Sequence, residues 1–349
     1  MPIRPPFLSL SIAETEQVLV ELGTSPRHAK PLRRALLFGE SLRETRAPDW
    51  VVDALAERVR WISCESVEQL TSEDGSVKHV VQLEDGRMVE TVHLPGALAG
   101  APSACISSQV GCAMACRFCA TGLDKVARNL AAHEILEQVV LVRRLAPVRR
   151  LVFMGAGEPT QNLRNVAAAL EVLRDEAEIG PKKIMISTVG PASAVDRLTS
   201  LGLRFTLALS LHTANHAKRA ALIPTQKKVD PIELLDAADR FSRQTRRAYQ
   251  VEYVLLGGVN DSPEDAKELA AALKGRRLHV SVIRWNPVDG MEFRTPSMEA
   301  ARVFVTVLHA ADISAQLRRT VGQESAAACG QLRANRVSRD DEELGRERV

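Results

Sequence analysis

Three cysteines lie within eight residues of one another, Cys112, Cys116 and Cys119 in the segment GCAMACRFCAT. Thiolates are the protein ligands of iron–sulfur clusters, and a cubane cluster needs four ligands. A C-x3-C-x2-C run with no fourth cysteine beside it therefore leaves one iron free to bind a small molecule. The same residues also allow a zinc site completed by a histidine, or three unrelated buried thiols. Zinc sites usually pair two separate C-x2-C elements, so the spacing favours the cluster.

Two further cysteines are candidates for thiol chemistry. Cys105 precedes the cysteine motif by seven residues, and Cys329 lies among small residues in SAAACGQL, which would suit an exposed loop. The simpler interpretation is that both are small buried hydrophobic residues, as most intracellular cysteines are. Cys64 lies in a segment that we expect to be helical, and we assign it a structural role.

The composition is that of an ordinary enzyme. The 349 residues are 45% hydrophobic, which suffices for one large core and a small accessory domain. No apolar run reaches the roughly 18 residues that span a membrane, and the prolines near Met1 do not fit a signal peptide. Six cysteines are too few for a secreted disulfide framework, so we expect a cytoplasmic protein with no membrane partner. The net charge of +3 means that nucleic-acid binding would have to come from local basic clusters.

Two accessory regions precede the main domain. Residues 1–75 read as a helical domain, in which Ser11 and Glu14 form a capping box and Gly23 ends the first helix. Residues 76–100 alternate apolar and polar side chains around Glu84-Asp85-Gly86, which predicts a β-hairpin extension. A basic segment of the helical domain is either a solvated helix face or a surface that contacts RNA phosphates, and it comprises Arg27, His28, Lys30, Arg33 and Arg34.

Residues 101–332 alternate β-rich runs with helical patterns such as 131–145 and 263–274. This is the pattern of βαβ units around a parallel sheet, with six units where a closed barrel has eight. The charged segment 333–349 has no apolar periodicity, and we expect a flexible tail. The expected strands are 104–109, 151–154, 182–186, 204–210, 249–256 and 278–284.

Polar or glycine-rich residues follow several of these strands. In a parallel barrel the carboxyl ends of the strands meet at one rim, where the chemistry takes place. Each such residue alone could be a strand-end cap without a function. Together they predict a polar ring for a ligand with amine, carboxylate and ribose groups, built from 155–159, Ser187-Thr188, Ser210-Leu211-His212 and 285–287.

The cysteine motif with Phe118 resembles the signature of radical S-adenosylmethionine (radical-SAM) enzymes. Further motifs resemble those of the RlmN/Cfr family of radical-SAM RNA adenosine methyltransferases, from about Val89 to Leu332. The resemblance implies an α/β fold with an open, partial (β/α)6 barrel, one 4Fe-4S cluster per chain and S-adenosyl-L-methionine as cofactor. The matching segments are ACISSQVGCAMACRFCATG, RNLAAHEI, FMGAGEPTQNL, ISTVGP, ALSLHT, EYVLLGGVND, IRWNP and AACGQL.

The resemblance also implies roles for single residues. Cys112, Cys116 and Cys119 would hold the cluster, and Cys329 would be methylated and would carry the one-carbon unit. Cys105 would resolve the enzyme–RNA cross-link, and Glu90, in VETVHLP, would accept the ring proton. The residues that would contact S-adenosylmethionine are Gly157, Glu158, Ser187, Ser210, Leu211, His212 and Asn286.

The implied reaction is methylation of carbon 2 of an adenosine in rRNA, tRNA or both. Carbon 2 has no acidic proton, so a radical route is needed, with an external electron donor such as flavodoxin and a thiol reductant. Two alternatives stay open: the same machinery acting on carbon 8 or on another RNA, and a non-catalytic iron–sulfur or zinc RNA-binding protein. The chain departs from the family pattern at Lys125-Val126-Ala127 and at 321–325, so the target nucleotide is an expectation only.

Overall fold

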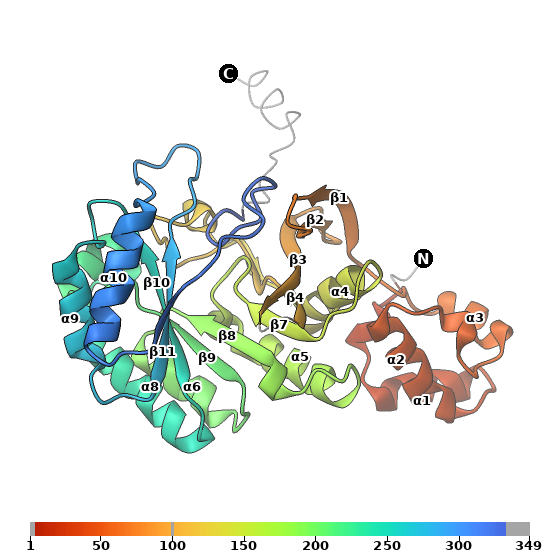
Figure 1. The fold of residues 1–349 in the computed structure, drawn as a ribbon. Coiled ribbons are helices and arrows are strands. Elements are labelled where there is room, and N and C mark those ends of the chain that lie inside the picture. The colour runs from red at the N-terminus through yellow and green to blue at the C-terminus, as the bar shows by residue number, and fades with distance from the viewer. Residues whose placement is uncertain (1–3, 99–100, 333–349) are drawn as a thin grey trace, which may run out of the picture.

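The computed structural model describes residues 4–98 and 101–332 of the chain. The segment 333–349, which we expected to be a flexible tail, lies outside the described residues. A ten-stranded sheet runs through the molecule in the order β1-β2-β3-β4-β7-β8-β9-β10-β11-β12. Helices α1 to α3 form a separate lobe at one end, beside α4 and α5 (Figure 1). Among the described residues, no helix is long and apolar enough to cross a membrane.

The N-terminal lobe consists of α1 (Ile12–Glu21), α2 (Ala29–Phe38) and α3 (Asp49–Ala56). The predicted capping box is confirmed, because the Glu14 amide donates to Ser11 Oγ at 3.2 Å and the Ser11 amide donates to Glu14 Oε2 at 2.7 Å. Gly23 follows the helix with a φ of +74°, a conformation that favours glycine. Local capping therefore fixes the start and the end of α1.

The basic segment of this lobe is only partly a solvent-facing surface. Arg33 is 1% exposed, and its Nε and Nη2 donate to Glu176, just after α5 (Leu163–Asp175), at 2.6 and 3.1 Å. His28 is also buried, whereas Arg27 and Lys30 are exposed. The buried ion pair fastens the lobe to the barrel, so Arg33 is not free to contact RNA.

Three antiparallel strands, β1 (Glu65–Thr71), β2 (Val77–Gln82) and β3 (Met88–Leu98), connect the lobe to the barrel. The hairpin of β2 and β3 around Glu84-Asp85-Gly86 is confirmed, but β1 lies inside the range that we assigned to a helical domain. The helices end at Ala56, and Cys64 precedes β1 as a buried residue. The expectation of a helical context for Cys64 was therefore wrong.

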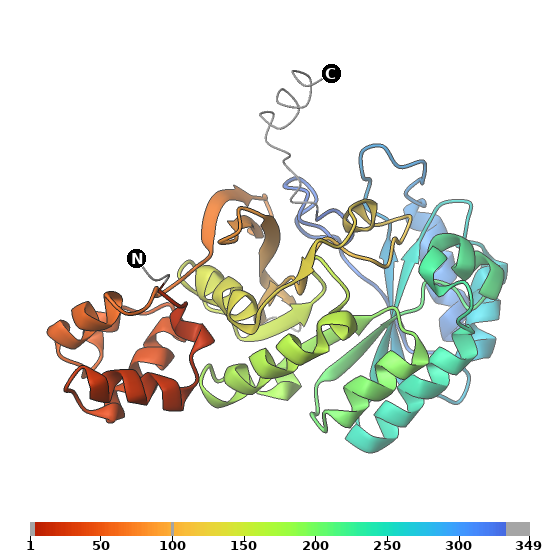
Figure 2. The same cartoon turned by 180° about the vertical axis from the view of Figure 1, so that it is seen from behind.

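The parallel part of the sheet contains all six predicted strands and one more, β12, that the sequence did not indicate. Strand β4 begins before the expected range 104–109 and shares only residues 104 and 105 with it. Helices lie between these strands in the chain, and most of them cover the outer face of the sheet, as the view from behind shows (Figure 2), whereas α7 (His216–Leu222) packs against the cysteine loop. The strands are β4 (Ala101–Cys105), β7 (Arg150–Phe153), β8 (Ile184–Thr188), β9 (Thr206–Ser210), β10 (Tyr249–Leu255), β11 (Leu278–Arg284) and β12 (Ala315–Leu317). The helices are α4 (Ala132–Arg143), α5, α6 (Ala192–Ser200), α7 (His216–Leu222), α8 (Pro231–Thr245), α9 (Pro263–Leu273) and α10 (Met298–Ala310).

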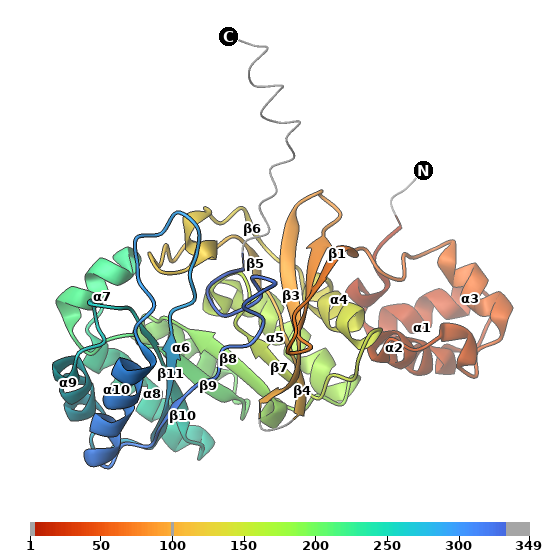
Figure 3. The same cartoon turned by 45° about the horizontal axis from the view of Figure 1, so that its top comes forward.

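The core between sheet and helices is apolar and closely filled. Phe153 on β7, Phe205 before β9, Phe241 on α8 and Phe304 on α10 are at most 1% exposed. A filled core fixes the strand positions, so the loops that follow the strands are held at one rim. The cysteine loop, which includes the short strands β5 (Gln109–Val110) and β6 (Arg128–Asn129), and the segment after β12 both lie over this rim (Figure 3).

Candidate active site

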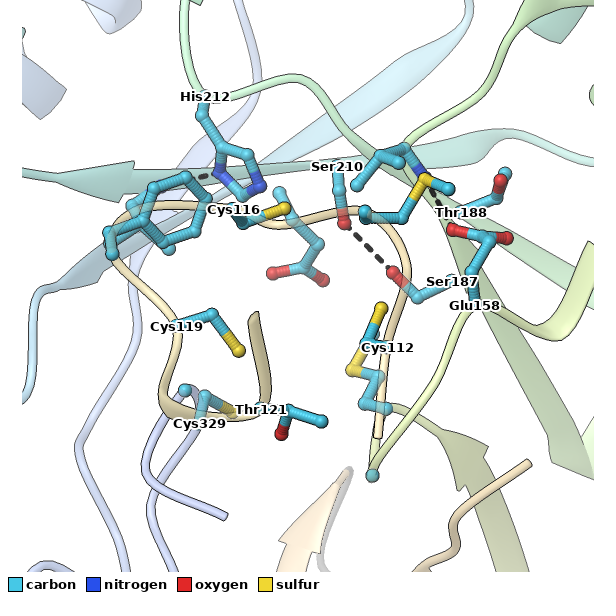
Figure 4. Close-up of a pocket in the computed structure, with 18 of the residues that line it drawn as sticks. Cys112, Cys116, Cys119, Thr121, Glu158, Ser187, Thr188, Ser210, His212 and Cys329 are labelled. Atoms are coloured by element: carbon cyan, nitrogen blue, oxygen red, sulfur yellow. Dashed lines mark hydrogen bonds between the residues drawn. The ribbon is translucent and has the colours of Figure 1, made fainter. Parts of the chain in front are cut away.

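A cavity of about 160 Å³ lies at the carboxyl ends of the parallel strands. Cys112, Cys116 and Cys119 lie around it in the close-up of Figure 4, which also labels Cys329. The cavity brings together most of the predicted site. The predicted residues that line it are Cys112, Cys116, Cys119, Gly157, Glu158, Ser187, Ser210, His212 and Cys329.

The cysteine loop is held by apolar packing on one side of the cavity. Cys116 and Phe118 pack with Leu222, Ile223 and Trp285 in one cluster. The indole Nε1 of Trp285 donates to the carbonyl of Phe118 at 2.8 Å. The strand ends therefore position the loop, which has little regular structure of its own.

Burial makes the three thiols hard to ionise. It raises the pKa of Cys112 to about 12 and that of Cys116 well above its usual value, and it raises the pKa of Cys119 as well. Within the described residues, no three His, Cys, Asp or Glu side chains converge closely enough to hold a single metal ion. The thiols line a volume, and a cationic iron group placed in it would favour their thiolate forms.

A buried cation close to the thiols supports this fit. Arg219 on α7 is 0% exposed, and its Nη1 has no hydrogen-bond partner among the described residues. Its positive charge lowers the pKa of Cys116, opposing the effect of burial. A set of three thiols with an unpaired donor beside them fits a 4Fe-4S cluster, because three thiolates make such a group anionic.

Gly157 and Glu158 follow β7 at the edge of the cavity. Gly157 has a φ of +102°, and a Cβ there would lie 2.6 Å from Cβ of Gln109 and 2.7 Å from its backbone nitrogen. The Glu158 carboxylate accepts hydrogen bonds from Thr160 and from the amide of Val189 at 3.1 Å, while burial raises its pKa. This carboxylate could accept a further bond from a ligand ammonium group.

Replacing Gly157 with alanine is expected to abolish binding of S-adenosylmethionine at concentrations that saturate the original protein. Alanine would be strained at this φ, and its methyl group would push Gln109 away from the Glu158 amide, which donates to Gln109 Oε1 at 2.8 Å. Equilibrium dialysis of the cluster-loaded protein measures the loss. Gly180→Ala is the matched control, since nothing lies within 4 Å of a Cβ at Gly180. Equal binding by both variants would remove Gly157 from the site.

Two serines and a histidine also line the cavity. The hydroxyls of Ser187 and Ser210 lie 2.9 Å apart in a hydrogen bond. His212 adopts a φ of +62° and packs edge-on against Phe118, with ring centroids 4.7 Å apart. Burial lowers the pKa of His212 to about 3, and the Val254 amide donates to its Nδ1 at 3.2 Å. The ring is therefore neutral at pH 7, and Nε2 carries its proton.

Two of the predicted contact residues do not line the cavity. The side chain of Leu211 is fully buried in the core, and its amide donates to the Glu252 carbonyl at 3.1 Å. Asn286 donates from Nδ2 to the carbonyl of Cys329 at 3.0 Å. Leu211 can therefore reach a ligand only through its backbone, while Asn286 holds the loop that carries Cys329.

Cys105 and Cys329 line a second, smaller cavity of about 20 Å³. Cys329 is exposed and lines the main cavity as well. Cys105 is buried, and burial raises its pKa to about 12. All six cysteines of the structure are free thiols, so the two are neighbours without a disulfide.

The segment 319–332, here called the carrier loop because it holds the predicted carrier Cys329, rests on β2 and on the turn between β1 and β2 through polar contacts. Ser72 Oγ donates to Ser325 Oγ at 2.6 Å, and the Gly322 amide donates to Asp74 at 2.7 Å. Lys78 Nζ donates to the carbonyl of Ala326 at 3.3 Å. These contacts help to position Cys329.

Glu90 lies on β3 away from both cavities. It is 3% exposed, and its Oε1 forms an ion pair with Lys78 Nζ at 3.0 Å. Through Lys78 the carboxylate is joined to the carrier loop. The structure therefore places this predicted residue near the loop but does not bring it among the residues that line the cavity.

Three charged residues of the site were not predicted: Glu252 on β10, Arg318 after β12, and Arg219. Glu252 and Arg318 line the main cavity, with 3.8 Å between Arg318 Nη1 and Glu252 Oε2. Arg318 also lines the cavity of Cys105. A signal for Glu252 was available, because a carboxylate within the apolar run YQVEYVLL must face a polar interior or a partner.

Comparisons with known proteins agree with this geometry. Residues 106–272 match the Radical SAM superfamily. The chain is 41% identical to "Probable dual-specificity RNA methyltransferase RlmN" of Rhodopirellula baltica, over 96% of this chain and 92% of that protein. It is 37% identical to "Probable RNA methyltransferase" of Stutzerimonas stutzeri, over 97% of this chain and 99% of that protein.

A solved structure shares the whole fold. The radical SAM methyltransferase from Sphaerobacter thermophilus superposes with a TM-score of 0.86 and 34% identity, covering 95% of this chain and all of the other. The fold, the cysteine cavity and the similarity over nearly the full length together place the chain in the RlmN/Cfr family of radical-SAM RNA methyltransferases, which use S-adenosylmethionine and a 4Fe-4S cluster.

Proposed function

We propose that this RNA methyltransferase methylates carbon 2 of an adenosine in rRNA, tRNA or both, with Cys329 as the carrier of the one-carbon unit. The observation that carries the proposal is the position of Cys329. It is exposed, and it lines both the cavity of the three other cysteines and the cavity of Cys105. One thiol can therefore meet the methyl donor, the RNA base and a second thiol.

We assign a separate role to each group of site residues. Cys112, Cys116 and Cys119 would hold the 4Fe-4S cluster, whose chemistry with S-adenosylmethionine supplies the methyl group and the radical. Glu158 would accept a bond from the ligand's ammonium group, and the hydroxyls of Ser187 and Ser210 would be available to bind its ribose. The neutral His212 offers a donor at Nε2 without adding a second positive charge beside the sulfonium.

Glu90 would take the proton that leaves carbon 2. Its ion pair with Lys78 keeps a negative carboxylate in a buried place, and Lys78 connects it to the carrier loop. A movement of that loop towards RNA would change the position of this pair. We therefore propose Glu90 as the proton acceptor of the complex with RNA, a state in which the loop has moved.

The remaining requirements are met from outside the chain. We propose an external one-electron donor such as flavodoxin for the cluster, a thiol reductant for the cysteine pair, and the cytoplasm as the compartment that supplies both. The N-terminal lobe, with Arg27 and Lys30 exposed, is proposed to contact RNA.

The decisive experiment uses S-adenosylmethionine with a fully deuterated methyl group, the reconstituted enzyme and total RNA. If Cys329 carries the carbon, one deuterium is lost to the radical and one solvent proton completes the methyl group. Mass analysis of nucleosides should then show 2-methyladenosine with two deuterium atoms, and Cys329→Ala should yield none. Three retained deuterium atoms would contradict the carrier, and 8-methyladenosine would favour the alternative target carbon.

A further inference from the structure

The guanidinium of Arg219 is buried without an acidic partner among its hydrogen bonds. Its Nη2 donates to the carbonyls of Val189 at 2.7 Å and Ser210 at 3.4 Å, and its Nε donates to the carbonyl of Leu211 at 3.3 Å. Its Nη1 has no hydrogen-bond partner in the part of the chain that the structure describes. The side chain is 0% exposed, so bulk water does not reach that nitrogen.

A buried, unpaired cation costs folding free energy, and backbone carbonyls offset only part of the cost. Burial lowers the pKa of Arg219 to about 10, which still leaves the side chain charged at pH 7. Glu158, the carboxylate on the other side of Val189, is held by Thr160 and by the Val189 amide. The hydrogen-bond partners of Arg219 therefore include no anion that could neutralise its positive charge.

The group that the three thiols would hold is the candidate for such an anion, because thiolates bound to iron carry negative charge. The Arg117 amide donates to the carbonyl of Leu222 at 3.0 Å, which joins the cysteine loop to the last residue of α7. Leu222 packs with Cys116 and Phe118, one helical turn from Arg219. The charges of Arg219 and Cys116 act on one another directly, each shifting the pKa of the other.

We propose that Arg219 donates a hydrogen bond from Nη1 to the anionic iron–sulfur group held by Cys112, Cys116 and Cys119, and that its charge makes this group easier to reduce. The proposal rests on the assignment of these three cysteines as cluster ligands. Adding one electron from the external donor makes the group more negative by one charge. A fixed cation and a hydrogen bond to sulfur both stabilise the more negative state.

The same guanidinium also braces the neighbouring ligand site. Its three carbonyl acceptors follow or end β8 and β9, and the Val189 peptide that it holds donates to Glu158 on its other side. A substitution at Arg219 should therefore have two effects. The loss of its charge should change the reduction potential of the cluster, and the loss of its hydrogen bonds should shift the ends of β8 and β9. Arg219→Lys keeps the charge and loses most of the bracing, while Arg219→Gln loses the charge.

The test is a redox titration of the reconstituted proteins, monitored by the electron spin signal of the reduced cluster. At a fixed ambient potential, Arg219→Gln should show a ratio of reduced to oxidised cluster at least tenfold lower, about 59 mV for one electron. Arg219→Lys should stay within about threefold of the original protein. Arg33→Gln is the matched control, because it removes a buried guanidinium far along the chain and should lower thermal stability but not the potential. An unchanged potential in Arg219→Gln would overturn the proposal.

A second measurement does not depend on how the variants fold. The original protein is produced with 15N confined to the guanidino groups of arginine, reduced, and studied by electron–nuclear double resonance. A 15N coupling to the cluster is expected, and its absence would overturn the proposal. Neither measurement needs RNA, so a failure of the proposed methylation would leave this result intact.

Discussion

Cys112→Ala is expected to leave the anaerobically reconstituted protein with almost no iron. Four thiols line the main cavity, but only Cys112, Cys116 and Cys119 belong to the cysteine motif, and a cluster held by three protein ligands has none to spare. Iron and sulfide analysis per chain, together with the visible absorbance of the cluster, measures the effect.

Cys64→Ala is the matched control for this loss. Cys64 is buried before β1, outside the residues that line the cavity, so its replacement should leave the iron content unchanged. A Cys112→Ala protein with the full complement of iron would show that the three cysteines are not the ligands.

Cys105→Ala is expected to trap the enzyme on its substrate. In the proposed cycle, the Cys105 thiolate attacks Sγ of Cys329 in the cross-linked thioether, and an S–S bond forms while the S–CH2 bond breaks. The electron pair of that bond goes to the carbon, which takes a proton and becomes the methyl group, and a thiol reductant later restores both cysteines. Without Cys105, protein covalently attached to RNA should accumulate to about one per chain.

Denaturing gels and mass spectrometry of the nuclease-trimmed adduct measure this accumulation. The double variant Cys105→Ala, Cys329→Ala should form no adduct, which identifies the attachment point. Repeated turnover by Cys105→Ala without adduct would remove Cys105 from the mechanism.

The surroundings of Cys105 explain why this step needs help from the protein. Burial raises the pKa of Cys105, and a charge on Cys329 raises it further, whereas Arg318 lowers it. Arg318 lines the main cavity and the cavity of Cys105, so the same cation lies near both Cys105 and Cys329. If Cys105 is the nucleophile as proposed, its thiolate would form only when the carrier loop and Arg318 are correctly arranged around it.

The sequence was sufficient for six of the seven parallel strands and for most of the cavity. Most of the predicted strands carry a run of apolar residues rich in β-branched and aromatic side chains, and a parallel sheet places their carboxyl ends together. The three cysteines of the motif lie within eight residues, so their spacing alone indicated a shared ligand. A contact between residues so close in the chain can be read from one sequence.

Strands β1 and β12 were missed for a physical reason. The residues of β1 are all exposed or half-buried, so the segment ESVEQLT has no apolar face to reveal it. Strand β12 spans three residues and is followed by charged side chains. Both form because a neighbouring strand supplies their hydrogen bonds, and that information lies elsewhere in the chain.

The buried charges were missed for a related reason. Arg219 lies in a short helix that reads as solvated, and only the packing of α7 against the cysteine loop shows that its side chain is inside. Arg33 was likewise grouped with surface cations, although it reaches a glutamate in another part of the chain. Long-range pairing of this kind leaves no periodic signal in the sequence.

The contacts between the carrier loop and the β1–β2 segment affect how easily Cys329 can move during the reaction. The three bonds from Ser72, Asp74 and Lys78 are polar, and water can replace each of them at a net cost of about 1 kcal/mol. Release would also uncover Ala327 and Leu332, which pack against Val92, Leu94 and Val152, so apolar contacts hold the loop as well. If Cys329 carries the one-carbon unit as proposed, the enzyme has to break and remake these contacts once in each cycle.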